Sequence, residues 1–129
     1  MITTDVFIAG AGIAGSIAAL SYAKSARNVI VADPFSYEES SKFDYRTTAY
    51  LQPSKLFLEL IGVWDCVKDS AMPLEVMKII DASGKGDPGK IKSEKNFNSS
   101  EISDLPFGWN VKNSLMRTTL QNLIEHQSN

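Results

Sequence analysis

The feature that most constrains the fold is a run of small residues near the start of the chain. Its sequence is Gly10-Ala11-Gly12-Ile13-Ala14-Gly15, which has the pattern GxGxxG. It follows an apolar stretch, Val6 to Ala9, that predicts a strand, and it precedes a helix-like stretch that runs to about Ala26. A strand, a glycine turn and a helix in this order are typical of a dinucleotide-binding turn.

Each glycine of this turn has its own physical reason. The first permits a tight backbone turn, the second permits a pyrophosphate to approach the backbone, and the third permits the helix to pack closely on the strand. The amides at the helix start then face the negative charge. We therefore expect the cofactor-binding set of the turn to be Gly10, Gly12, Ile13, Ala14 and Gly15.

An acidic residue follows at a suitable distance. Asn28 to Ala32 predict a second strand, and Asp33 ends that strand about 20 residues after the turn. A carboxylate there can accept hydrogen bonds from both hydroxyls of an adenosine ribose, and it disfavours a 2′-phosphate. The alternative is that Gly15 and Asp33 are packing and turn residues of an unrelated strand-helix-strand unit.

The remaining segments predict further elements. A polar loop, 35–44, leads to a helix that begins at Pro53, and a short helical turn spans Trp64 to Asp69. A strand over residues 74–81, a turn at 81–89, a partner strand over 91–97 and a final helix over 114–125 follow. Two apolar stripes are expected in the core. The helix that begins at Pro53 carries Phe57, Leu60, Ile61 and Trp64, and the final helix carries Met116, Leu120, Leu123 and Ile124.

Four segments together carry a family likeness. They are Asp5 to Gly15 with Asp33; Asp44-Tyr45-Arg46-Thr47-Thr48-Ala49-Tyr50-Leu51; Leu56 to Trp64; and Trp109-Asn110-Val111-Lys112-Asn113. With them in this order, the chain resembles the aromatic-ring-hydroxylating flavin monooxygenases, most closely the ubiquinone-biosynthesis hydroxylases. The resemblance spans nearly the whole chain but covers only the amino-terminal part of such an enzyme.

This resemblance implies an α/β fold in three parts. Residues 1–73 correspond to an incomplete, Rossmann-like FAD/NAD(P)-binding βαβ unit. Residues 74–106 correspond to the first strands of a substrate-side sheet, and residues 107–129 to a truncated return to the FAD-binding domain.

The resemblance also implies an activity, which is the hydroxylation of an aromatic ring with O2, with FAD as cofactor and NAD(P)H as reductant. The cofactor carries the chemistry, and the protein binds and orients it. The expected substrate is a small aromatic compound, prenylated if the quinone pathway applies. Because family segments that hold the flavin are missing, we expect the 129-residue chain alone to be inactive and to bind FAD weakly or not at all. We assign no catalytic residue and no metal ligand within it.

Two more cofactor-binding residues follow from the resemblance. Arg46 matches an arginine near the flavin and its pyrophosphate, where a planar cation binds phosphate oxygens; the alternative is that it tethers the Asp44 loop. Asn113 matches a polar residue near the cofactor and is also placed to cap the last helix. Ser114 stands where family members commonly have arginine, which puts a phosphate contact from Ser114 or Arg117 in doubt.

Two other functions stay open. One is an FAD-linked reductase or dehydrogenase that uses the same adenosine site without oxygen insertion. The other is a non-catalytic nucleotide-binding module, complete at 129 residues. Continuation of the reading frame beyond Asn129 separates the fragment from the module.

The composition and a few single residues limit the kinds of partner, metal site and location that we expect. A net charge of -2 gives no electrostatic reason to expect nucleic acid. The one cysteine, Cys66, excludes an internal disulfide and is expected to be buried, and the one histidine, His126, has no companion for a metal site. No stretch suits a membrane span or a secretory signal, so we expect a cytoplasmic location. For the full-length enzyme the resemblance leaves open a peripheral association with the inner membrane and an oligomer or biosynthetic complex.

Overall fold

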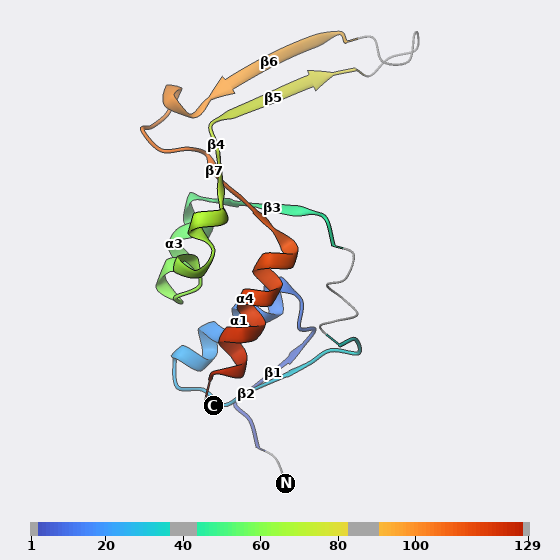
Figure 1. The fold of residues 1–129 in the computed structure, drawn as a ribbon, viewed down its shortest axis with the longest axis vertical. Helices are drawn as coiled ribbons and strands as arrows, with labels where there is room; N and C mark the ends of the chain where they lie inside the picture. The colour runs from blue at the N-terminus through green and yellow to red at the C-terminus, as the bar shows by residue number, and fades with distance from the viewer. Residues whose placement is uncertain (1–2, 37–43, 83–90, 128–129) are drawn as a thin grey trace.

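The computed structural model describes residues 3–36, 44–82 and 91–127. Its helices and strands form an α/β fold, as the sequence predicts (Figure 1). In chain order they are β1 (Val6–Ala9), α1 (Ile13–Lys24), β2 (Val29–Ala32), β3 (Thr47–Leu51), α3 (Gln52–Leu60), β4 (Met72–Leu74), β5 (Val76–Asp81), β6 (Ser93–Asn98), β7 (Gly108–Lys112) and α4 (Asn113–Glu125). Residues 37–43 of the predicted polar loop and residues 83–89 of the predicted turn at 81–89 lie outside the described residues.

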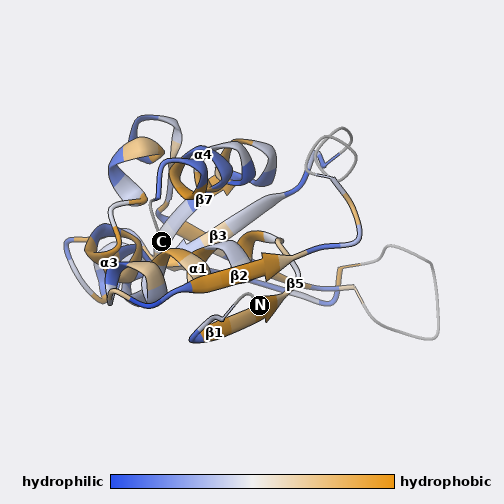
Figure 2. Cartoon of the chain, turned by 90° about the horizontal axis from the view of Figure 1, so that it is seen from below, coloured by the Kyte–Doolittle hydropathy of each residue, from blue (hydrophilic) through white to orange (hydrophobic). Residues whose placement is uncertain are grey.

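The first three elements form a parallel βαβ unit. β1 pairs in parallel with β2, from Val6 opposite Val29 to Ala9 opposite Ala32, and α1 makes the crossover between them. Both strands are short and apolar, as their colour in Figure 2 shows, and such residues favour strands. The predicted strand, turn, helix and strand are therefore confirmed, with α1 ending two residues before the expected limit.

A second sheet brings the middle of the chain back to its end. It has the order β3-β7-β4, and all its pairs are antiparallel. Gly108 permits the close approach of β7 to β3, because a Cβ at this position would overlap the backbone of Tyr50. Strand β7 leads directly into α4, so this sheet fixes where α4 begins. The predicted domain boundaries fall within β4 and just before β7, and the division remains a prediction.

The core lies between this sheet and the helices. Helix α4 packs against α1, and its residues Met116 and Leu120 are fully buried, as predicted. Leu123 and Ile124 are partly buried against the same cluster. The other fully buried side chains of this cluster are Leu58, Val63, Val67 and Val111.

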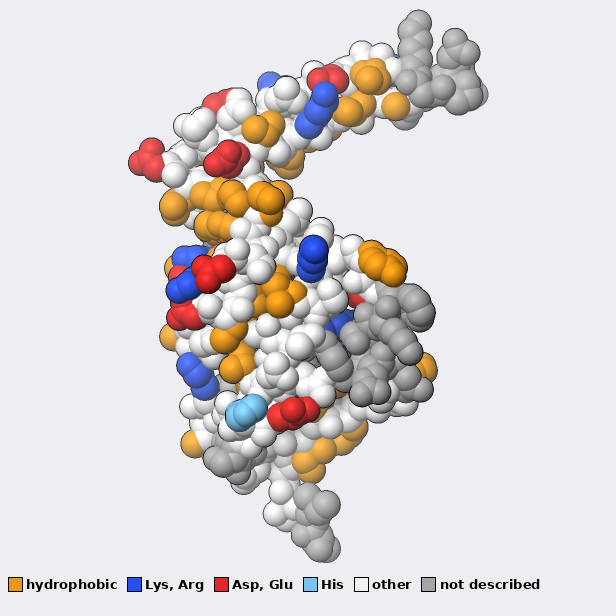
Figure 3. All heavy atoms as spheres, in the orientation of Figure 1, with side chains coloured by type: hydrophobic (Ala, Val, Ile, Leu, Met, Phe, Trp, Pro, Cys, Tyr) orange, Lys and Arg blue, Asp and Glu red, His pale blue; other side chains and the backbone are white. Residues whose placement is uncertain are grey.

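The strands β5 and β6 form an antiparallel hairpin, from Val76 opposite Asn98 to Asp81 opposite Ser93. The predicted partner strand is therefore confirmed. The hairpin projects away from the rest of the molecule (Figures 1 and 3). Its apolar residues Val76, Met77, Ile79 and Ile80 are exposed.

The predicted apolar stripe of α3 is wrong in part. Ile61 and Trp64 are buried, but Leu60 is 73% exposed and Phe57 is 41% exposed, whereas Leu58 is only 1% exposed. Residues 57 and 58 both stand three or four positions from Ile61, so helical spacing allows either of them to face the core. Because α3 packs against β3 and β7 of the second sheet, Leu58 is the residue that is buried.

The expectation for Cys66 is also wrong, because this side chain is exposed. The predicted helical turn is present as two short 3-10 segments, Trp64–Cys66 and Lys68–Ser70. Val63, Trp64 and Val67 are buried. They occupy the inward side of this tight turn and leave Cys66 on its outer side.

Candidate functional site

The glycine turn between β1 and α1 gives its three glycines separate roles. Gly10 has a φ of 106°, which side chains rarely adopt. A Cβ on Gly15 would overlap the carbonyl oxygen of Gly10, so this glycine permits α1 to pack on the turn. A Cβ on Gly12 would meet no atom within 4 Å. The space beside Gly12 is therefore open to a ligand.

Asp33 lies directly against this turn. Its Oδ2 accepts a hydrogen bond of 2.7 Å from the N–H of Ala11, and its Oδ1 accepts one of 2.9 Å from the N–H of Phe35. Donation by Phe35, and then by Ala11, holds the pKa of the Asp33 carboxyl below its ordinary value of 3.8. The carboxylate is therefore charged at neutral pH and stands at the mouth of the turn.

No side chain of α1 neutralises the positive end of the helix dipole at the start of the helix. Gly12 is the N-cap, no side chain caps the helix, and the first turn has no acidic residue. The first N–H groups of a helix lack partners within it, and the helix dipole favours an anion at this end. Ser16 points its hydroxyl to the Ala11 carbonyl, at 3.1 Å, rather than to these N–H groups. The turn can thus bind an anion through its backbone.

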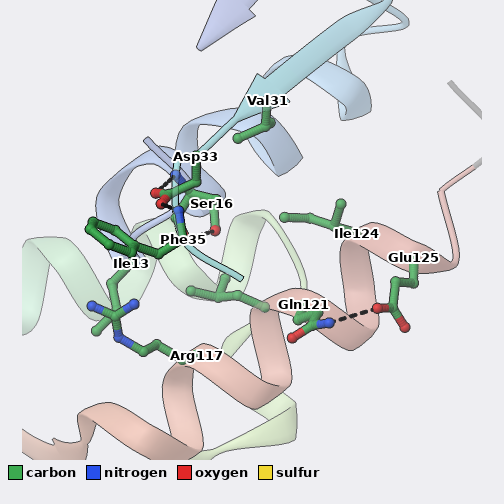
Figure 4. A pocket seen from close by; sticks show the side chains of 11 residues that line it. Ile13, Ser16, Val31, Asp33, Phe35, Arg117, Gln121, Ile124 and Glu125 are labelled. Carbon is green, nitrogen blue, oxygen red and sulfur yellow. Dashed lines mark hydrogen bonds between the residues drawn. The ribbon is translucent and has the colours of Figure 1, made fainter. Parts of the chain in front are cut away.

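A cavity of about 270 Å³ opens beside the turn. Figure 4 shows residues of the turn and of the end of β2 on one side and residues of α4 on the other. The lining residues are Ala11, Ile13, Ser16, Val31, Asp33, Phe35, Arg117, Leu120, Gln121, Ile124 and Glu125. The cavity therefore joins an anion-binding turn, a carboxylate and apolar walls, which suits a ligand with phosphate, sugar and ring parts.

Arg46 and Asn113 belong to a separate network around Asp44. Arg46 donates to both carboxylate oxygens of Asp44, at 2.8 and 2.9 Å, and its side chain is 76% exposed. These bonds hold the pKa of the Asp44 carboxyl well below its usual range. Neither Arg46 nor Asn113 lines the cavity. The structure thus shows the tether arrangement for Arg46, and a cofactor contact from either residue remains a prediction.

Asn113 does not cap α4 as predicted. Lys112 is the N-cap, and Asn113 is the first residue of the helix. Its Oδ1 accepts a hydrogen bond of 2.7 Å from the Thr48 hydroxyl, and its Nδ2 donates to Asp44 at 3.3 Å. The buried amide therefore links α4 to β3 and to the Asp44 loop and does not cap α4.

Of the residues that line the cavity, only Ile13 and Asp33 were assigned to the site from the sequence, and Phe35, Arg117 and Gln121 are among those that were not. Arg117 is the most notable, because sequence reasoning put its phosphate contact in doubt. Arg117, Leu120, Gln121 and Ile124 stand three or four residues apart along α4, and all four line the cavity. That spacing is the signal in the sequence that could have identified it.

Over residues 3–36, 44–82 and 91–127, no group of three or more His, Cys, Asp or Glu side chains could hold a metal ion. The helices in these same ranges are all too short or too polar to cross a bilayer.

Neither protein-family models nor curated proteins give a match to this chain. Solved structures do. A p-nitrophenol 4-monooxygenase from Pseudomonas putida matches with a TM-score of 0.67 and 16% identity, over 95% of this chain and 29% of that one. A flavoprotein/dehydrogenase from Cytophaga hutchinsonii matches with a TM-score of 0.68 and 23% identity, over 97% and 28%.

A third match is a tetracycline destructase, Tet(51), with a TM-score of 0.56 and 12% identity, over 97% of this chain and 29% of that one. The chain therefore spans less than a third of the length of each of these structures. These likenesses show a common fold, and they confirm the predicted fold class.

Proposed function

We propose that this chain is the amino-terminal, FAD-binding part of a flavin-dependent oxidoreductase. One observation carries the proposal: the Asp33 carboxylate is hydrogen-bonded to the backbone of the same glycine turn whose open side lies at Gly12. A carboxylate that binds the ribose and a turn that binds the phosphates must be adjacent to hold an adenosine diphosphate. Here they are adjacent and already ordered.

The roles of the residues follow from this geometry. The backbone at Gly12 and the first amides of α1 would hold the diphosphate. Each Asp33 oxygen accepts one backbone hydrogen bond and retains acceptor capacity for a ribose hydroxyl. FAD would supply the redox chemistry, while these residues bind and orient its adenosine half. We assign no proton transfer to a side chain of this chain.

For the reaction we propose oxygen insertion into an aromatic ring, with NAD(P)H as reductant. The sequence resemblance supports this reaction, and so does the fold shared with a p-nitrophenol 4-monooxygenase. The ubiquinone-pathway substrate, a peripheral membrane association, and an oligomer or biosynthetic complex rest on the resemblance alone. The cytoplasmic location stays the expectation that was drawn from the sequence. The second candidate is a flavin-linked dehydrogenase, which the fold shared with the Cytophaga flavoprotein/dehydrogenase favours.

The test uses the chain extended along its reading frame beyond Asn129. We expect a yellow protein that consumes O2 and NAD(P)H together when an aromatic substrate is present. In this protein Gly12→Val should remove the flavin, because a branched side chain would fill the open space at the turn. Retention of the full flavin content by Gly12→Val would contradict the assigned site. Oxidation of NAD(P)H without O2 uptake would favour the dehydrogenase.

A further inference from the structure

Two arginines lie near the proposed cofactor site, and their guanidinium groups are in different states. Arg46 is exposed and makes a two-point contact with Asp44. The Arg117 side chain is 19% exposed, and its Nε is buried with no hydrogen-bond partner among residues 3–36, 44–82 and 91–127. This Nε forms an ion pair with Asp44 Oδ2 at 3.8 Å, a distance that is too long for a hydrogen bond. A buried donor without an acceptor is costly, and a ligand acceptor would remove that cost.

The position of Arg117 also favours a contact with a bound ligand. Its side chain extends from α4 into the cavity, which Ile13 of α1 and Phe35, three residues after β2, also line (Figure 4). Among the described residues that line the cavity it is the one cation, and Asp33 and Glu125 are the acids. A bound diphosphate would add more negative charge beside Asp33. A cation on the facing wall would offset that charge.

The Asp44 carboxylate does not require Arg117. It already accepts two bonds from the Arg46 guanidinium, one from the Arg46 backbone N–H and one from Asn113. The guanidinium of Arg117 is a planar fork that suits phosphate oxygens. We propose that Arg117, rather than Arg46, is the cation that binds the cofactor diphosphate. This inference rests on the proposed function and assigns to that site a residue on α4.

The test compares ADP with adenosine, because the two probes differ only in the diphosphate. Each is titrated into the ¹⁵N-labelled chain, and amide shifts give the dissociation constants. In Arg117→Met we expect ADP affinity to fall by about tenfold or more, toward that of adenosine, because charge-assisted hydrogen bonds are lost. Adenosine affinity should stay unchanged. In Arg117→Lys, the charge without the fork should restore part of the preference for ADP.

Two further variants serve as a matched control and as a test of the competing assignment. Arg27→Met removes the same charge beyond the opposite end of α1 and should leave the ADP-to-adenosine ratio unchanged. Arg46→Met is the competing assignment: loss of the ADP preference there, with Arg117→Met unaffected, would overturn the inference. If Arg117→Met does not fold, Arg117→Gln removes the charge with a polar side chain instead, and an undiminished ADP preference in that variant overturns the inference as well.

The same titration separates this inference from the proposed function. If ADP binds at the turn of the unmodified chain and Arg117→Met binds it equally well, only the role of Arg117 fails. If neither ADP nor adenosine shifts the amides of the turn in the unmodified chain, and the extended protein also purifies without flavin, the proposed function fails, and the inference fails with it.

Discussion

The carboxylate of Asp33 accepts a 2.7 Å hydrogen bond from the backbone N–H of Ala11, which lies 22 residues earlier in the chain. This bond joins the end of β2 to the glycine turn. A second bond, from the N–H of Phe35, fixes the other oxygen of the same carboxylate. The two parts of the proposed site are therefore held together before any ligand binds, which reduces the ordering cost of binding.

The Asp33 bonds predict a pH dependence of stability. The pKa of Asp33 is lowered in the folded chain, so its carboxylate stabilises the fold above the unfolded-state pKa, near 3.8, and loses this effect as the pH falls through the folded-state pKa. The free energy of unfolding should therefore decrease as the pH falls below about 4. In Asp33→Asn this decrease should be smaller, because the group no longer titrates. Urea unfolding at several pH values measures it, and identical pH profiles for both proteins would count against the Asp33 contacts.

The glycines of the turn should respond differently to alanine. Gly15→Ala should lower the free energy of unfolding by about 1–3 kcal/mol, because the new Cβ overlaps the Gly10 carbonyl. Gly12→Ala should change it by less than about 1 kcal/mol, because its Cβ meets open space and φ is ordinary at -67°. Thermal or urea unfolding of the two variants checks this difference. Equal losses would show that the turn is packed in another way.

The βαβ unit could be predicted from the sequence because its determinants are local. An apolar strand, a glycine turn and an alanine-rich helix each specify their own backbone, and the turn fixes their order. The position of Asp33 followed from the length of that unit. The anion-binding turn and its neighbouring carboxylate were therefore predictable in outline.

The rest of the site depends on contacts between distant segments. Helix periodicity could not choose between Phe57 and Leu58, because both stand three or four residues before Ile61, and the second sheet selects the buried face of the nine-residue α3. Arg117 reaches the cavity because β7 sets where α4 starts and which face turns to α1. Asn113 faces Thr48 for the same reason. Propensity and spacing do not encode such pairings.

The buried and exposed leucines of α3 give a direct stability test. Leu58→Ala should cost about 2–5 kcal/mol, because it empties a fully buried position in the core. Leu60→Ala, on the same helix, should cost no more than about 0.5 kcal/mol, because Leu60 is exposed. Urea unfolding of both variants measures the contrast. A larger loss for Leu60→Ala would restore the stripe that the sequence predicted.

The Asn113 amide should couple α4 to β3. Asn113→Ala should lower the free energy of unfolding by about 1–3 kcal/mol, because it leaves buried polar partners unsatisfied. Asn122→Ala, at an exposed position of the same helix, is the matched control and should change it by less than about 0.5 kcal/mol. A double-mutant cycle with Thr48→Val should give a coupling of about 0.5–3 kcal/mol. Additive effects would mean that the Thr48–Asn113 bond does not contribute to stability.

The central claim is that the phosphates of an adenine cofactor lie against residues 10–15, with the ribose at Asp33. An ADP titration of the ¹⁵N-labelled chain, followed by the amide signals of assigned residues, tests it most directly. We predict weak, saturable binding at millimolar ADP, with the largest shift changes at residues 11–15 and 33–35. No change at these amides, or changes confined to the β5–β6 hairpin, would contradict the account.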